Sequence, residues 1–384
     1  MNAAELTIAL IEHDSRNPSL VPGAPGEATV AQFLANLLTE WQFDVTLSDV
    51  VPGRPNVVAR AGKKNGRSIM LNGHLDVVGI DGMTHPPFQP IQRDGRIYGR
   101  GSADMKGGVA AMCVAARDAM RAGLDGEVII AAVIDEEYGS LGTQALIDGG
   151  IRADAAIVTE PTRLTIAPAH RGFVWADIDV RGRAAHGSRY DLGVDAITNA
   201  ALILAELDLL QRNTFATVSH PLLGRPSLHA STIQGGTGLS TYPDRCLIAI
   251  ERRTIPGEDE ATVRREIDAA CTAVRQRIGT LDVNVTITGA QGPSEVAADA
   301  EIVRALSGAL RHEGASIAIE GMRAWTDCAI LNAAGIPAIC FGPGDLSLAH
   351  ATEEYVPVQE LETAARVLRQ LVTSWCNTSR SPSH

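Results

Sequence analysis

Apolar and polar residues alternate along the chain with the periods of helices and strands, and these periods predict its elements. Over 26–42 the apolar side chains recur three and four residues apart, which is typical of an amphipathic helix. Short apolar runs bounded by glycine, proline or charge predict buried strands at 68–73, 127–134, 155–159 and 336–341. A helical stripe over 104–122 separates the first two runs. This alternation of strands and helices predicts an α/β domain.

The pattern changes at about Phe173, where apolar and polar residues begin to alternate along single strands. The expected elements are a strand, a helix, two strands, a helix and a strand, at 174–180, 192–210, 228–235, 244–252, 258–278 and 281–289. This βαββαβ order is that of a ferredoxin-like unit. Because 336–341 again has the pattern of a strand of the first domain, the small unit is expected to be an insertion. The predicted domains are 1–172 with 291–384, and the inserted 173–290.

Length, charge and cysteine spacing narrow the class of protein. At 384 residues the chain is longer than one hydrophobic core usually organises, which agrees with two domains. The net charge is −12, and the 33 lysines and arginines form no long run, so nucleic acid is not an expected partner. The six cysteines show no CxxC spacing, so we expect small buried thiols rather than disulfides or a zinc knuckle.

The sequence shows neither the pattern of a membrane helix nor that of a secretory signal, and both bear on localisation. No apolar stretch approaches the roughly 20 residues that a membrane helix needs. The segment from Met1 to Leu10 lacks the basic residues that precede the apolar stretch of a secretory signal. We therefore expect a cytoplasmic protein that does not bind membranes.

Side chains that bind metals stand just past predicted strands, where an open α/β sheet presents its active site. His74 and Asp76 end the run 68–73. Residues two apart in an extended segment share a face, so His74 can bind a metal while Asp76 orients its other ring nitrogen. The alternative is a hydrogen-bonded histidine at a strand end.

Asp104 lies between glycines just before the helix predicted at 104–122. An aspartate at this position can simply cap a helix. The flanking glycines, however, let the backbone close around a fixed carboxylate, and a carboxylate has two oxygens with which to bridge two cations. Glu160 and His350 follow two further strands.

Three adjacent carboxylates, Asp135, Glu136 and Glu137, follow the strand predicted at 127–134. Such carboxylates repel one another unless a cation or a proton intervenes, or unless they form a solvated acidic turn. Neighbouring Glu136 and Glu137 point differently, so one can bind metal while the other takes a proton from water. Together, two histidines and at least three carboxylates form a mixed nitrogen and oxygen set suited to zinc or its neighbours.

The motifs NGHLDVV, YGRGSADMKGG, DEEYGSLGT, TEP and FGPG…AHATEEYV occur in this order along the chain. In these motifs the chain resembles the M20 metallopeptidase family, which includes acetylornithine deacetylase, succinyl-diaminopimelate desuccinylase, aminoacylase and carboxypeptidase G. The resemblance extends from about residue 5 to about residue 375. It implies a catalytic domain with a mixed, mostly parallel sheet flanked by helices, and an inserted lid and dimerisation domain.

The resemblance also implies two divalent metal ions, of which zinc is the first choice and cobalt or manganese the alternatives. The implied ligands are His74 and Glu160 on one ion, Glu137 and His350 on the other, and Asp104 bridging both.

Further roles are implied for residues around the metal ions. Asp76 would support His74, and Glu136 would be the general acid and base. A cis peptide is expected between Asp104 and Met105.

Three residues of the inserted domain match positions that have a role in the family. His186 matches a lid histidine that reaches the active site of the partner subunit and stabilises the oxyanion, so a homodimer is expected. Arg253 matches the arginine that holds a substrate carboxylate. Ser240 stands where relatives often have asparagine, so the substrate pocket is expected to differ there.

The expected reaction is hydrolysis of the amide bond of a small N-acyl amino acid by a metal-bridged water, with Glu136 as the general base. The alternative is a carboxypeptidase or dipeptidase, because peptide cleavage uses the same metal site. A non-catalytic binding relative is a third class, but it would be expected to lack Glu136 or a ligand, and neither is missing. The motifs do not distinguish among acyl groups, amino acid side chains or metals.

Overall fold

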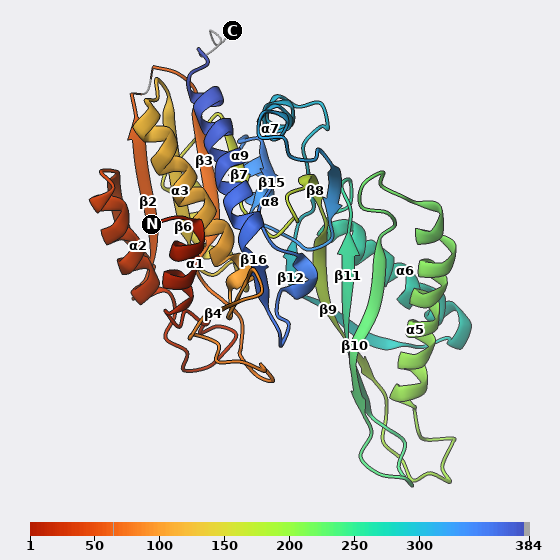
Figure 1. Cartoon of the computed structure of the whole chain (residues 1–384). Helices are drawn as coiled ribbons and strands as arrows, with labels where there is room; N and C mark the ends of the chain where they lie inside the picture. Colours follow the sequence, from red (N-terminus) through yellow and green to blue (C-terminus); the bar gives the residue numbers. More distant parts are fainter. Residues whose placement is uncertain (64, 380–384) are drawn as a thin grey trace. The chain divides into compact units, whose positions relative to one another are not determined.

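The computed structural model describes residues 1–63 and 65–379, and they form two compact units (Figure 1). The first unit consists of Met1–Pro168, Val296–Glu320 and the segment from Thr326 onward. The second consists of Ala169–Glu295 and Gly321–Trp325. The predicted domain boundaries are at 172/173 and 290/291, and residues 380–384 of the first predicted domain lie outside the described residues. The functions expected for the two domains stay predictions.

A mixed sheet runs through the first unit in the order β1-β2-β6-β3-β7-β15-β8. Its central strands are parallel: β6 (Glu127–Val133), β3 (Ser68–His74), β7 (Ala155–Val158) and β15 (Ala338–Cys340). The outer strands pair antiparallel: β1 (Asp44–Val51), β2 (Arg54–Gly62) and β8 (Ile166–His170). The predicted α/β class with a mixed sheet is confirmed, and parallel pairing is confined to the central strands.

Helices cover both faces of this sheet, which explains why its strands are continuous apolar runs. Ile69 and Leu71 of β3 belong to the main apolar core, together with side chains of the helices α1 (Ala3–Ile11), α2 (Ala28–Glu40), α3 (Gly107–Ala122), α7 (Glu301–His312) and α9 (Val358–Cys376). Asn72 faces the other way and donates to Thr143 of α4 (Leu141–Asp148). A short helix, α8 (Cys328–Ala333), contacts α4.

The helix predicted at 104–122 begins later than expected. The regular helix α3 starts at Gly107, and Ser102–Lys106 forms a separate turn in which Asp104 and Met105 have non-helical backbone angles. The glycines on both sides of Asp104 permit this break. Three further strands of the first unit, β16 (Tyr355–Pro357), β5 (Arg96–Tyr98) and β4 (Ile91–Arg93), form a small sheet of their own.

The second unit has the predicted βαββαβ order, with β9 (Gly172–Arg181), α5 (Ala196–Asn213), β10 (Ser227–Gly235), β11 (Arg245–Thr254), α6 (Glu260–Ile278) and β12 (Asp282–Gln291). Its antiparallel sheet has the order β10-β11-β9-β12, so the ferredoxin-like arrangement is confirmed. Alternate residues of β9, Val174 to Val180, are buried in an apolar core shared with both helices.

The short strands β13 (Ser294–Glu295) and β14 (Ile319–Met322) pair with β8. One single helical turn, Phe215–Thr217, follows α5, and another, Leu346–Leu348, precedes His350. All six cysteines are buried and free, as the sequence predicted. Within residues 1–63 and 65–379, no helix combines the length and the apolar character that crossing a membrane requires.

Candidate metal centre

His74 is the last residue of β3 and is almost fully buried. Its Nδ1 lies 2.9 Å from the main-chain oxygen of Asp76, and its Nε2 lies 3.0 Å from Oδ1 of Asp104. Donation from Nδ1 to the carbonyl fixes the ring and turns Nε2 towards Asp104. Asp76 therefore holds His74 through its carbonyl, whereas its carboxylate oxygen is 3.6 Å from Nδ1.

Asp104 lies between the two predicted histidines. Its Oδ1 faces His74, and its Oδ2 lies 3.6 Å from Nε2 of His350. The peptide bond between Asp104 and Met105 is cis, as expected. Each oxygen of one carboxylate thus points at a different imidazole, an arrangement that suits a bridging ligand.

Glu354 fixes the turn that presents Asp104, a role that was not predicted from the sequence. Its side chain is fully buried; Oε1 accepts the main-chain N–H groups of Ala103 and Asp104 at 2.9 and 3.0 Å. Oε2 accepts from the N–H of Gly101 at 2.9 Å and from Arg100 at 2.7 Å. The partners of Glu354 are about 250 residues away in the sequence, so no local pattern predicts these bonds. The one local indication of its role is that it lies in the same segment as His350.

Glu136 and Glu137 leave a tight turn after β6 in different directions. Asp135 at the start of this turn has a left-handed backbone (φ 68°), and its carbonyl accepts from Gly139 at 2.9 Å. Oε2 of Glu137 lies 2.9 Å from Nε2 of His350. Oε2 of Glu136 lies 3.8 Å from Nε2 of His74. The two adjacent glutamates therefore face different histidines.

Among the described residues, two groups of ligand atoms lie close enough to hold an ion, each with all its atoms within 4.8 Å of one another. One group is His74, Asp104 and Glu137, and the other is His74, Glu136 and Glu160. The structure thus gathers all the predicted ligands, because His350 contacts both Asp104 and Glu137. Glu136 stands among the ligand atoms as well, so proximity alone does not separate a base from a ligand.

The electrostatics of the cluster favour a cation. Burial raises the pKa of Glu136 and Glu160 well above the usual range, and nearby carboxylates raise it further. Burial, followed by the charge of Asp104, raises the pKa of Glu137 to about 7. The hydrogen bond with Glu137 raises the pKa of His350 to about 9. Carboxylates that resist ionisation in this way are stabilised by a nearby positive charge.

An unpartnered atom also suits a metal ligand. Oε1 of Glu137 is buried and has no hydrogen-bond partner among the described residues. A buried carboxylate oxygen without a donor is costly. Together with the imidazoles and carboxylates around it, this atom indicates that the residues present fit divalent ions.

Asp327, just before α8, is a further buried carboxyl that was not predicted from the sequence. Its Oδ2 accepts from the hydroxyl of Thr143 at 2.6 Å, and burial raises its pKa to about 6. Its charge is one of the influences that raise the pKa of Glu136. No strand end or motif in the local sequence distinguishes this residue.

The predicted substrate residues belong to the second unit. His186 is exposed, and its Nδ1 lies 2.9 Å from Oγ of Ser188. Ser240 is exposed too, and its carbonyl accepts from the N–H of Gly187 at 2.7 Å. Arg253 is one-third exposed and lies 2.9 Å from Glu251. The roles expected for Arg253, His186 and Ser240 stay predictions.

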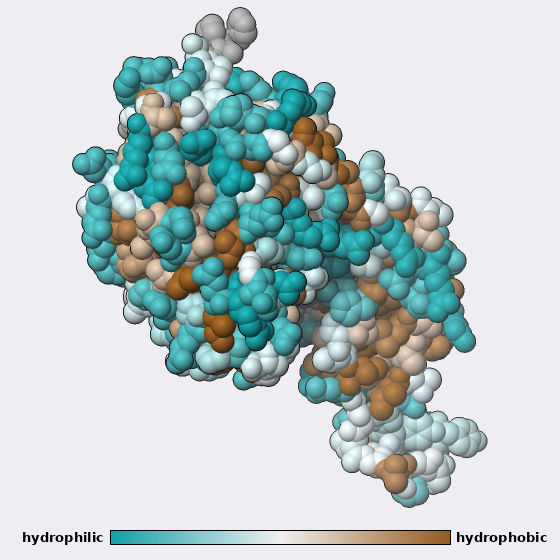
Figure 2. All heavy atoms as spheres, in the orientation of Figure 1, coloured by the Kyte–Doolittle hydropathy of each residue, from teal (hydrophilic) through white to brown (hydrophobic). Residues whose placement is uncertain are grey.

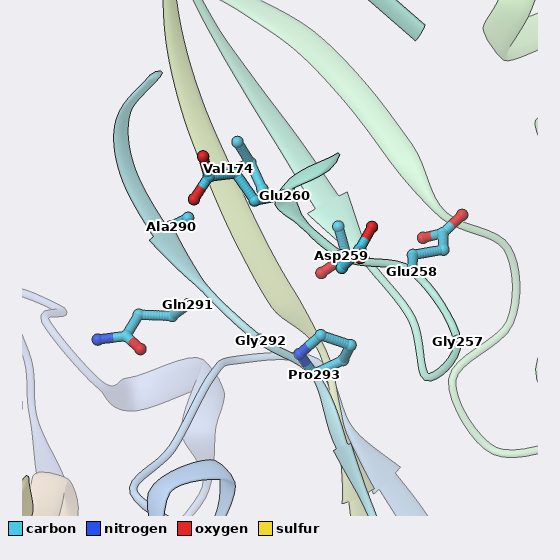
Figure 3. A pocket seen from close by; sticks show the side chains of 10 residues that line it. Val174, Gly257, Glu258, Asp259, Glu260, Ala290, Gln291, Gly292 and Pro293 are labelled. Carbon is cyan, nitrogen blue, oxygen red and sulfur yellow. The ribbon is translucent and has the colours of Figure 1, made fainter. Parts of the chain in front are cut away.

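The second unit also contains a hollow of about 500 Å³ (Figure 3). It is lined by the ends of β9, β11 and β12 and by the start of α6. Its side chains include Glu258, which binds the fully buried Arg252 at 2.7 Å. None of the predicted site residues lines this hollow, and its described lining contains no histidine or cysteine.

The class of protein follows from this site and from comparison with known proteins. The model of the Peptidase family M20/M25/M40 matches residues 70–374, and the chain belongs to this family. It is therefore a metallohydrolase that acts on amide bonds, as the sequence predicted.

Among curated relatives, the chain is 31% identical over 335 residues to acetylornithine deacetylase of Myxococcus xanthus, covering 86% of each protein. It is 29% identical to N-formyl-4-amino-5-aminomethyl-2-methylpyrimidine deformylase of Bacillus subtilis, covering 93% of this chain and 92% of that one.

Solved structures share the fold at lower identity. The aminopeptidase PepT from Bacillus cereus superposes with a TM-score of 0.80 at 21% identity, covering 97% of each chain. A dinuclear metal-binding peptidase of family M20 from Bacillus subtilis gives a TM-score of 0.76 at 17% identity, covering 98% of each.

Proposed function

We propose that the protein hydrolyses the amide bond of an N-acyl amino acid at a site with two divalent ions. The observation that carries this proposal is the Asp104 carboxylate, whose oxygens lie 3.0 and 3.6 Å from the imidazoles of His74 and His350. In this proposal Glu160 completes the site of His74, and Glu137 completes that of His350. Zinc is the proposed metal because the ligands combine imidazole with carboxylate, and cobalt or manganese would suit the same set.

Divalent ions bound there would supply an acidified water and polarise the scissile carbonyl. Glu136 is the proposed proton carrier: burial raises its pKa, so its carboxyl can accept a proton from water and return it to the leaving nitrogen. His186 is proposed to donate to the oxyanion, a contact typically worth ~2.7–4 kcal/mol.

N-deacylation is proposed over peptide cleavage because curated relatives at 31% and 29% identity are named as a deacetylase and a deformylase. Structural neighbours named as peptidases are less similar in sequence. Arg253 is the proposed partner of the substrate carboxylate, and Ser240 lies in the proposed substrate pocket. The alternative remains a carboxypeptidase or dipeptidase.

A cytoplasmic homodimer through the second unit is part of the proposal. The edge strand β10 exposes nearly all its residues, including Ile233, and α5 exposes Ile197 and Leu209. Figure 2 shows an apolar area over these elements. An unpaired strand edge beside apolar side chains can pair with a second copy of itself.

The substrate proposal is tested with zinc- or cobalt-loaded protein and a panel of N-formyl, N-acetyl, N-succinyl and N-carbamoyl amino acids and dipeptides. We expect kcat/KM to be at least tenfold higher for one N-acyl class than for any dipeptide. Glu136→Gln, purified in the same way, controls for contaminating hydrolases. A dipeptide as the best substrate would favour the alternative.

A further inference from the structure

The carboxylate of Asp76 is bound to the turn that carries the two glutamates. Its Oδ1 accepts the main-chain N–H of Glu136, and its Oδ2 accepts that of Glu137, both at 3.2 Å. Because these donors are peptide groups, the position of the carboxylate helps to set the direction in which both side chains leave the backbone. Asp76 thus contacts His74 through its carbonyl and the glutamate turn through its side chain.

Asn17 joins this carboxylate to a second one. Its Nδ2 donates to Oδ2 of Asp76 at 2.8 Å and to Oδ1 of Asp135 at 3.0 Å. Its Oδ1 accepts from the N–H of Ser19 at 2.9 Å, which assigns the nitrogen to the side facing the carboxylates. Asn17 is fully buried, and its two carboxylate partners lie 59 and 118 residues further along the chain.

Arg54 and Glu27 complete the contacts of Asp135. Nη2 of Arg54 donates to Oδ1 of Asp135 at 3.0 Å and to Oε1 of Glu27 at 2.6 Å. All three side chains are buried. The neutral amide of Asn17 and the guanidinium of Arg54 therefore share one oxygen of Asp135, and they offset the repulsion between two buried carboxylates.

We propose that Asn17 is a positioning residue for the active site. It holds the carboxylates of Asp76 and Asp135 at a fixed separation, and through them it fixes the peptide groups of Glu136 and Glu137. The inference rests on the proposed function for the roles of the two glutamates. None of the hydrogen bonds described for the Asn17 side chain goes to His74 or His350, so in this proposal it acts through the turn.

The test measures zinc binding by calorimetry and steady-state kinetics on full-length protein. Asn17→Ala removes both donated hydrogen bonds, and we expect the weaker zinc site to lose about 10–100-fold in affinity. We expect kcat to fall by a similar factor with KM unchanged, because no substrate contact is lost. Asn17→Asp keeps the shape and the acceptor for Ser19 but adds a third carboxylate, so its effect is expected to be larger.

Asn332→Ala is the matched control. Like Asn17, Asn332 uses both polar atoms of its side chain, but both bonds go to one residue: its Nδ2 donates to the carbonyl of Ala338 at 3.0 Å and its Oδ1 accepts from the N–H of Ala338 at 2.8 Å. We expect this variant to lower Tm while zinc affinity and kcat stay within about twofold of wild type, because the described side-chain hydrogen bonds of the partly buried Asn332 go to β15 and not to the turn that carries the glutamates.

Two results would overturn the inference. One is wild-type zinc affinity and kcat in both Asn17 variants. The other is additive losses of zinc affinity in the double variant Asp135→Asn with Asn17→Ala. If Asn17 acts through Asp135, the double variant should bind zinc only a little more weakly than the weaker-binding single variant. Failure of the proposed function is distinguishable, because a wild-type protein that hydrolyses no N-acyl amino acid would still report the effect of Asn17 on zinc binding.

Discussion

At the scale of single residues, the adjacent glutamates after β6 differ in what they face. Glu137 lies 2.9 Å from His350, while Glu136 lies 3.8 Å from His74. Burial raises the pKa of both. A ligand and a proton carrier make different demands on a carboxyl, because a ligand must stay ionised whereas a carrier must gain and lose a proton near neutral pH. This difference gives a direct test of their roles.

Glu136→Gln should bind both metals and lose about 10²–10⁴-fold in kcat, because the amide keeps the shape but cannot carry a proton. Metal content by mass spectrometry and kcat on the best substrate measure this. Glu137→Gln is the paired variant and should bind less metal. Loss of both metals from Glu136→Gln would show that the two roles had been exchanged.

The metal-free protein offers a pH test of Glu137. Its pKa is about 7 in the fold against an ordinary value of 4.5, so the folded state holds a proton that the unfolded state releases between these values. The contribution of Glu137 to the free energy of unfolding is fully present below pH 4.5 and is lost as the pH rises towards 7. Because other groups also titrate over this range, the pH dependence of the wild-type stability is compared with that of Glu137→Gln, which lacks this carboxyl.

Thermal unfolding in a chelator measures this difference. We expect the Tm of wild type, relative to Glu137→Gln, to fall by about 3 °C between pH 5 and pH 7. A relative Tm that stays constant or rises over this range would mean that Glu137 is not held protonated in the metal-free fold.

At the scale of elements, the turns between strands and helices are fixed by buried side chains from elsewhere in the chain. The turn Ser102–Lys106 is bound by Glu354, which lies immediately before β16. The turn after β6 is bound by Asp76, which follows β3. Ligands at strand ends therefore depend on neighbours that the local pattern does not reveal.

Glu354→Gln should weaken zinc binding by about 10–100-fold and lower Tm by several degrees. The amide replaces one acceptor oxygen with a donor, and Arg100 loses a charged partner in a buried site. Glu353→Gln is the control because Glu353 is exposed, and its stability should change by no more than about 0.5 kcal/mol. Equal zinc affinity in both variants would mean that Glu354 does not position Asp104.

At the scale of the whole molecule, the proposed dimer would make the active site composite. His186 is exposed in the second unit and binds only its neighbour Ser188 through its ring nitrogen in the described hydrogen bonds. If His186 serves the partner's metal centre, then His186→Ala and Glu136→Gln each lack a different part of one site. Either variant alone should lose about 10²-fold or more in kcat.

A heterodimer of the two variants should recover about half of wild-type activity per dimer, from one complete site. The chains are co-expressed with separate tags, the doubly tagged species is purified, and hydrolysis is measured. Activity no higher than that of the parents, in a verified heterodimer, would mean that His186 acts within its own chain or has only a structural role.

Much of the fold follows from the sequence alone, because side-chain burial repeats every two residues in a strand and every 3.6 in a helix. The continuous apolar runs of β3, β6 and β7 and the alternation along β9 are such local signals. The helix α1 and the hairpin of β1 and β2 were not predicted. The exposed pattern of β1 gives little periodic signal, and its pairing with β2 is made in the folded chain.

For the site, the sequence determined which side chains stand at strand ends, and so the chemistry they can perform. Only the tertiary structure decided which glutamate faces which histidine, that the carbonyl of Asp76 holds His74, and that its carboxylate holds the glutamate turn. It alone brought Asn17 to Asp135 and Glu354 to Asp104, across 118 and 250 residues. Local periodicity carries no information about such pairs, because their geometry exists only once the sheet has brought its strand ends together.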